Sequence, residues 1–116
     1  MKSNKLVEIA VDALEEIKAY DIVILEVDDK VALFDYMIVA SADSSRQTNA
    51  LANNVQEKVK TVGGKVYSME GQQTGEWLLV DLGDVIVQMM LPAVREYYDL
   101  ETLWTEAKSL KENIVD

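Results

Sequence analysis

Two apolar runs joined by a Gly-Asp pair constrain the fold of this chain more than any other feature. The runs cover residues 76–82 and 85–90, and both are rich in Val, Ile and Leu. Glycine supplies the positive φ that a two-residue hairpin loop requires, so Gly83 and Asp84 predict a tight β-hairpin. A two-residue loop also fixes the register, because successive side chains of a strand point to opposite faces. The pairs expected on one face are Leu82 with Val85, Val80 with Val87, and Leu78 with Met89.

The two faces of this predicted hairpin differ in character. The face that carries Val80 and Val87 is entirely apolar, which indicates a core. The other face mixes an aromatic ring, an acid and an amide with apolar groups, and its members are Trp77, Leu79, Asp81, Ile86, Gln88 and Met90. Such a mixture suits a docking surface for another protein better than a closed core.

Composition narrows the chemistry that the chain can perform. Its 116 residues include no Cys and no His. This excludes disulfides, thiolate chemistry, the usual zinc and haem ligands, and imidazole acid-base catalysis. A chain of this length folds as one domain that buries roughly two thirds of its unfolded surface without disulfides or metal. We therefore expect a single domain over residues 1–116, with a core at 4–104, a C-terminal tail at 105–116, no metal and no cofactor.

The charge balance and the absence of sorting signals limit partners and compartment. Asp and Glu number 21 against 11 Lys and Arg, which gives a formal net charge of -10. A surface this acidic repels a phosphate backbone, so direct nucleic-acid binding is disfavoured. The first residues lack a signal or transit pattern, and no apolar run reaches the roughly 20 residues that span a bilayer. These features predict a cytoplasmic protein that does not enter a membrane.

Hydrophobic periodicity predicts the other elements. The expected elements are a helix at 4–19, a strand at 22–27 with a turn at 28–30, a strand at 34–40, a helix after residue 44, a strand at 65–69, a polar loop at 70–75 and a helix at 92–98. The strand at 34–40 is apolar on both faces from Met37 onward, which indicates an interior strand. This order predicts an α/β fold, a mixed five-stranded sheet with helices mainly on one face.

The predicted helix after residue 44 has clear start and stop signals. Ser44 and Gln47 have capping-box spacing, and Gly63 and Gly64 stand where a left-handed residue ends a helix. The buried stripe of this helix is expected at Leu51, Val55, Val59 and Val62.

Two groups of polar residues permit a chemical interpretation beside a structural one. Asp35, Asp81 and Asp84 stand at strand ends and could hold a divalent metal. No acid-x-acid strand pattern accompanies them, so turn, strand-start and surface roles are favoured. Residues 44–46 could cradle an anion at a helix start. A plain capped helix, with Arg46 paired to an acid, is favoured because such caps are common.

Aromatic and sulfur-containing side chains also have two interpretations. Tyr97, Tyr98 and Trp104 could stack nucleic-acid bases, although no basic groove accompanies them. Closure over a sheet edge or a protein-binding patch explains them better. The methionines act as core fillers or as an adaptable interface, and they are Met37, Met69, Met89 and Met90.

A series of short motifs runs in one order along nearly the whole chain, from about residue 5 to Trp104. The motifs are residues 35–41, 44–47, 70–71, Trp77, 80–87, Arg95, Tyr98, 100–101 and 103–104. Together they resemble the ribosomal silencing factor family, also called RsfS or Iojap-like. Two departures from the family pattern concern Gln88, where the family often has His, and residues 91–93, where acids are common.

The resemblance implies a fold and a function. The fold is nucleotidyltransferase-like but lacks the catalytic acid pair that binds metal. The function is binding to the fourteenth protein of the large ribosomal subunit, on the face that meets the small subunit. This binding blocks subunit joining and lowers translation when nutrients are scarce. The resemblance also implies a homodimer in the free protein and no enzymatic activity. The alternative is a nucleotidyltransferase-like enzyme or a nucleotide-binding protein.

The family pattern and the hairpin register together give six candidate partner-binding residues. They are Trp77, Asp81, Leu82, Gln88, Met90 and Tyr98. The family pattern supplies Trp77, Leu82 and Tyr98 as anchors, and the register adds the other three. We expect Asp81 to pair with a basic side chain of the partner. Leu82 lies at a strand position that points to the core face, so it contributes to partner binding only if the hairpin tip projects past the helices.

Overall fold

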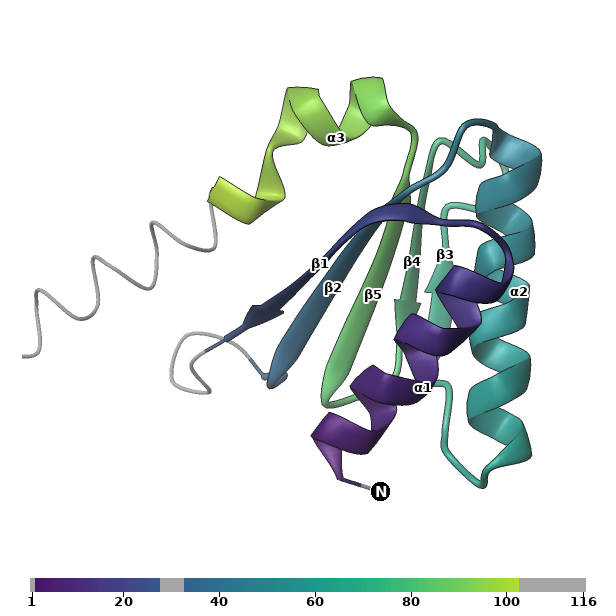
Figure 1. Cartoon of the computed structure of the whole chain (residues 1–116), viewed down its shortest axis with the longest axis vertical. Helices are drawn as coiled ribbons and strands as arrows, with labels where there is room; N and C mark the ends of the chain where they lie inside the picture. Colours follow the sequence, from purple (N-terminus) through teal and green to yellow (C-terminus); the bar gives the residue numbers. More distant parts are fainter. Residues whose placement is uncertain (1, 28–32, 103–116) are drawn as a thin grey trace, which may run out of the picture.

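The structure is a computed structural model, and it describes residues 2–27 and 33–102. Helices and strands are interspersed along the described residues (Figure 1). In chain order they are α1 (Ser3–Glu16), β1 (Tyr20–Glu26), β2 (Tyr36–Ser41), α2 (Ser45–Thr61), β3 (Ser68–Glu70), β4 (Trp77–Asp81), β5 (Val85–Met90) and α3 (Pro92–Tyr98).

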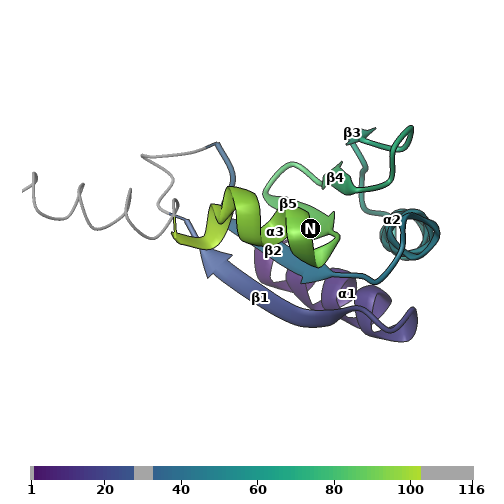
Figure 2. The same ribbon diagram turned by 90° about the horizontal axis from the view of Figure 1, so that it is seen from above.

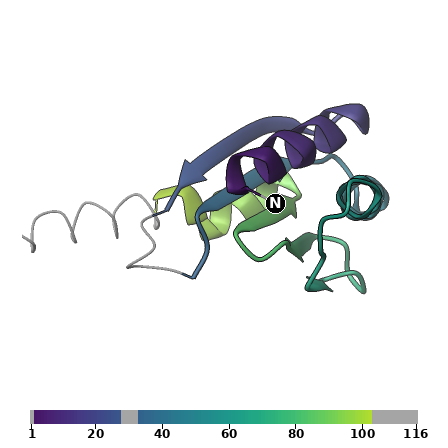
Figure 3. The same ribbon diagram turned by 90° about the horizontal axis from the view of Figure 1, so that it is seen from below.

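The strands form one mixed five-stranded sheet in the order β1-β2-β5-β4-β3. The β2–β5 pair is parallel and the other pairs are antiparallel. α1 and α2 pack on one face of the sheet, and α3 lies on the opposite side from α1 (Figures 2 and 3). The prediction of a mixed five-stranded sheet with helices mainly on one face is confirmed.

The hairpin of β4 and β5 has the predicted two-residue loop. Trp77 pairs with Met90 and Val80 with Val87, and the backbone N–H of Leu82 donates to the carbonyl of Val85 at 2.9 Å. Gly83 has a φ of 90°, which a residue with a Cβ rarely adopts. The register predicted from the sequence is therefore confirmed.

Strand alternation divides the buried side chains into two clusters on opposite faces of the sheet. The main cluster lies under α1 and α2 and includes Leu78, Val80 and Val87. A smaller cluster lies on the α3 side, and its buried members are Val27, Met37, Val39 and Met90. β2 contributes to both clusters, since it lies between β1 and β5. This confirms the prediction that it is an interior strand.

α2 begins and ends as its sequence predicts. Ser44 accepts a hydrogen bond from the backbone N–H of Gln47 at 3.1 Å. At the other end, the N–H groups of Gly63 and Gly64 donate to the carbonyls of Lys60 and Val59, a Schellman motif. The residues predicted for the buried stripe of this helix are buried, with one exception. Val62 is the C-cap, and its side chain is 50% exposed. Including Val62 in that stripe was wrong, because the helix ends at Thr61 and the Val62 side chain is half exposed.

Other element boundaries differ from the prediction for local reasons. α1 ends at Glu16 rather than residue 19, because Lys18 takes a left-handed φ of 68° and closes a Schellman motif without a glycine. The strand expected at 65–69 forms only at Ser68–Glu70, where β4 offers a pairing partner. The predicted turn at 28–30, the tail at 105–116 and Trp104 lie outside the described residues.

Two valines of α2 provide a test of this packing. Val59→Ala should lower the free energy of unfolding by about 2 kcal/mol, because it removes buried aliphatic groups and leaves a cavity. Val62→Ala, a turn away but half exposed, should change it by no more than about 0.5 kcal/mol. Urea denaturation measures both variants. Equal losses would contradict the placement of Val62 outside the core.

Candidate functional site

Three aromatic rings gather where α3 meets β4, and we call Trp77, Tyr97 and Tyr98 the aromatic cluster. The ring centroids of Trp77 and Tyr98 lie 4.7 Å apart with an interplanar angle of 47°. Tyr97 meets Tyr98 edge to face at 5.0 Å. Tyr98 is 52% exposed and Tyr97 more so, whereas Trp77 is half-buried. Exposed aromatic rings on a fixed base are typical anchors of protein interfaces.

Trp77 is held in place by Gln88 of β5, which pairs with Leu79 in the hairpin. Its Nε1 donates to Gln88 Oε1 at 2.6 Å, and Gln88 Nε2 donates to the Sδ of Met37 at 3.5 Å. The indole N–H can only donate, so it fixes which end of the Gln88 amide faces it. Gln88 is 4% exposed and Met90 is fully buried. Both side chains lie beneath Trp77, where they support the indole and offer no surface of their own.

The other two predicted residues lie nearer the hairpin tip. Asp81 is half-buried on the same face as Trp77, and its Oδ1 accepts a hydrogen bond from the N–H of Gly83 at 2.8 Å. Leu82 lies on the opposite face, buried in the main cluster. The structure therefore brings Trp77 and Tyr98 together and does not place Leu82 with them.

Arg95 is the residue of this region whose contacts sequence analysis missed. Its Nη1 donates to the carbonyl of Asp21 at 2.6 Å and to Ser41 Oγ at 2.8 Å. Its Nε forms an ion pair with Glu101 Oε1 at 2.8 Å. The first two partners lie 74 and 54 residues away in sequence, so no local pattern could reveal them.

One phenol at the same end of the sheet has a shifted pKa. Tyr20 Oη donates to Asp43 Oδ1 at 2.7 Å. This hydrogen bond raises the pKa of Tyr20 above its ordinary value, because the neighbouring carboxylate disfavours the phenolate. Tyr20 therefore remains a neutral donor at physiological pH and links the start of β1 to the loop before α2.

The acids considered as metal ligands have structural roles instead. Asp35 Oδ2 accepts a hydrogen bond from Ser3 Oγ at 2.5 Å, Asp81 supports the hairpin turn, and Asp84 is exposed in that turn. Within residues 2–27 and 33–102, no group of three or more His, Cys, Asp or Glu side chains is arranged to hold a metal ion. The same residues contain no helix long and apolar enough to cross a membrane.

The start of α2 is a closed cap. Gln47 Oε1 accepts the N–H of Asp43 at 2.9 Å, in addition to the bond from the Gln47 N–H to Ser44. Gln47 Nε2 donates to the carbonyls of Ile17 and Lys18, which ties this cap to the end of α1. Arg46 is exposed and forms no ion pair with any described residue, contrary to the expected pairing with an acid. The capped-helix interpretation is therefore favoured over an anion site.

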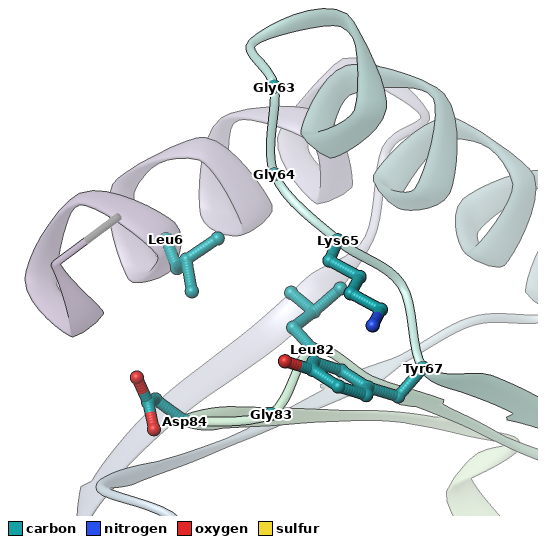
Figure 4. Close-up of a pocket in the computed structure, with 8 residues that line it drawn as sticks. All are labelled: Leu6, Gly63, Gly64, Lys65, Tyr67, Leu82, Gly83 and Asp84. Atoms are coloured by element: carbon teal, nitrogen blue, oxygen red, sulfur yellow. The ribbon is translucent and has the colours of Figure 1, made fainter.

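A pocket of about 210 Å³ opens beside the hairpin tip (Figure 4). Its lining combines apolar Leu6 and Leu82 with charged Lys65 and Asp84. Lys65 Nζ lies 4.8 Å from the ring centroid of Tyr67, so its charge is already engaged by an aromatic face. This pocket adjoins Leu82 of the main cluster and is separate from the aromatic cluster on the other face.

The bond between Trp77 and Gln88 gives the second test. Gln88→Met keeps the side-chain length but removes the acceptor, so it should lower the free energy of unfolding by about 1 kcal/mol. A Trp77→Phe background has no indole N–H. In that background Gln88→Met should lower the free energy of unfolding by about 1 kcal/mol less than it does in the native protein. Urea unfolding of the four proteins measures this coupling. Strictly additive costs would show that the bond contributes nothing.

Comparison with known proteins identifies the family. The family model described as ribosomal silencing factor during starvation, RsfS, matches residues 1–116. Ribosomal silencing factor RsfS of Chromobacterium violaceum is 51% identical over 104 residues, which cover 90% of this chain and 85% of that protein. A crystal structure of a protein from Chromobacterium violaceum is similar with a TM-score of 0.87 and 50% identity, over 90% of this chain and 88% of that one.

A more distant relative carries a name that refers to the large ribosomal subunit. Mitochondrial assembly of ribosomal large subunit protein 1 of Mus musculus is 30% identical over 102 residues, which cover 85% of this chain and 45% of that protein. The match of the RsfS family model over residues 1–116, supported by these relatives, shows that this chain belongs to the ribosomal silencing factor family.

Proposed function

We propose that this protein is a translational repressor that binds the large ribosomal subunit through its fourteenth protein and blocks the small subunit from joining, especially when nutrients are limited. The observation that carries the proposal is an exposed aromatic cluster on a member of the ribosomal silencing factor family. The name of the mouse relative, which refers to assembly of the large subunit, supports the choice of subunit.

Charge supports a basic partner. The net charge of -10 attracts positively charged surfaces from a distance and accelerates association with them. Ribosomal proteins carry many Lys and Arg residues because they contact RNA phosphates. Charge alone supplies little affinity, which comes from a few central anchors. In this proposal the acids steer the encounter, and Trp77 and Tyr98 supply the affinity.

The proposed mechanism is occupancy without catalysis. Two globular bodies cannot fill the same space, so a domain docked on the intersubunit face excludes the small subunit sterically. No bond is made or broken, and neither a metal nor a cofactor is needed. The named relatives are silencing factors, which agrees with a regulatory role. We further propose that the protein acts in the cytoplasm.

The free protein is proposed to form a homodimer. Tyr97 and Tyr98 expose aromatic area that water solvates poorly, and a second copy of the chain would cover it. Dimer formation through this surface would compete with ribosome binding, since one aromatic cluster cannot contact two partners at once.

Tyr98 and Tyr67 form a matched pair for testing the docking surface, because they are 52% and 59% exposed and lie on opposite faces of the sheet. Tyr98→Ala should weaken binding to isolated large subunits about 30-fold, the loss expected for an anchor worth about 2 kcal/mol. Tyr67→Ala should change the affinity less than about twofold. Co-sedimentation through sucrose gradients at several protein concentrations measures both.

The outcomes of this experiment distinguish a failure of the proposed function from a wrong choice of docking surface. A native chain that does not co-sediment with large subunits would refute the proposed function. Native binding that survives Tyr98→Ala, or that falls equally with Tyr67→Ala, would show that the aromatic cluster is not the docking surface. Tyr98 is preferred to Trp77 for this test, because Trp77 also packs against the smaller buried cluster and its loss would lower stability.

A further inference from the structure

α3 carries two of the three aromatic rings, yet burial does little to hold it. None of its residues is buried, and Val94 packs only in part against the smaller cluster. A helix of seven residues is not stable alone in water, because isolated helices need about 12–15 residues. The position of α3 on the sheet must therefore depend on other contacts.

Those contacts converge on Arg95. Its guanidinium joins the start of β1, the end of β2 and the segment after α3, through Asp21, Ser41 and Glu101. We call these four residues the Arg95 clamp. The Arg95 side chain is only 12% exposed and Ser41 is buried. Charged hydrogen bonds that are partly shielded from water, as those to Ser41 and Glu101 are, are stronger than the same bonds on an open surface.

Two aspartates in the left-handed region shape the clamp. Asp21 has a φ of 49° and lies where the β1–β2 register shifts, between Tyr20 and Val23. This irregularity leaves its carbonyl available to Arg95. Asp99 has a φ of 46°, and its N–H bonds to the carbonyl of Arg95 at 2.9 Å. The chain turns there and brings Glu101 back to the guanidinium.

Left-handed backbone at a residue with a Cβ costs free energy and persists only where surrounding contacts impose it. Both strained aspartates of this region serve the same side chain. The sheet edge and the end of α3 are thus both shaped to reach Arg95.

We propose that Arg95 is a positioning residue: the Arg95 clamp fixes α3 on the sheet and so holds Tyr98 against Trp77 in the arrangement that the ribosomal partner binds. The binding part rests on the proposed function. Tyr98 follows Arg95 by three residues, so both lie on neighbouring positions of one helix surface. Figures 1 and 2 together show α3 at the end of the sheet where β5 leads into it. A surface ordered before binding avoids the ordering cost that a mobile one must meet.

The first experiment measures the position of α3 without any partner. Arg95→Gln should accelerate hydrogen exchange of the α3 amides at least tenfold, while amides of β2 and β5 exchange as in the native protein. Arg46→Gln is the matched control, because Arg46 is exposed, pairs with no described residue and gives the same change in net charge. It should leave α3 exchange unaltered.

If Arg95→Gln does not fold, Ser41→Ala tests the same point by removing one of the three hydrogen bonds that the Arg95 guanidinium donates. It should accelerate α3 exchange in the same direction by a smaller factor. Native exchange rates for α3 in these variants would overturn the proposal.

The second experiment asks whether Arg95 acts through Tyr98. Arg95→Gln should weaken binding to large subunits about tenfold in the native background. In a Tyr98→Ala background it should have less than about a twofold further effect, since there is no ring left to position. Arg46→Gln should give the same small effect in both backgrounds.

The two experiments test the positioning role and the proposed function separately. Equal, additive losses from Arg95→Gln in both backgrounds would mean that Arg95 contacts the partner or steers it, which overturns the positioning role. Fast α3 exchange with unchanged affinity would overturn it too. If the native chain binds no large subunits, the proposed function fails, and the exchange rates still decide whether Arg95 holds α3.

Discussion

Everything in this fold depends on the alternation of side chains along β5, the central strand. Val85, Val87 and Met89 point to the main cluster under α1 and α2, while Gln88 and Met90 point to the α3 side. A slip of one residue would exchange these sets and bury the amide under the helices without its partners. The Gly83 turn prevents that slip on one side, and the parallel pairing with β2 prevents it on the other.

The α3 side of the sheet is built differently from the helical side. The main cluster is apolar and is covered by two long helices, which suits stability. The smaller cluster is covered by a seven-residue helix, and the contacts above it are a hydrogen-bonded indole, two tyrosines in edge-to-face contact and a largely buried guanidinium. These contacts fix the positions of the side chains more than they bury apolar surface. If the proposed docking through aromatic anchors is right, such a fixed surface is what it requires.

The local parts of the fold could be predicted from the sequence. The hairpin register follows from one turn, and the cap of α2 from Ser44 and Gln47, because each signal and its consequence lie within a few residues. The end of α1 could not be predicted, since Lys18 adopts a conformation usually taken by glycine. The site could be predicted only in part. The family pattern named Trp77 and Tyr98 as anchors, but their contact with each other was not predicted, and the burial of Gln88 and Met90 depends on neighbouring strands and on α3. The links of Arg95 to Asp21 and Ser41 join distant parts of the chain and leave no local pattern.

The most direct test of the account is light scattering of ribosomal subunits as they join. Large subunits are first incubated with increasing amounts of the native protein, and small subunits are then added. The account predicts that joining falls in proportion to the fraction of large subunits that the protein already occupies. When the protein is incubated first with small subunits, it should inhibit joining only to the extent that it then binds the large subunits added later. Full joining on large subunits shown to be saturated with the protein would contradict steric exclusion.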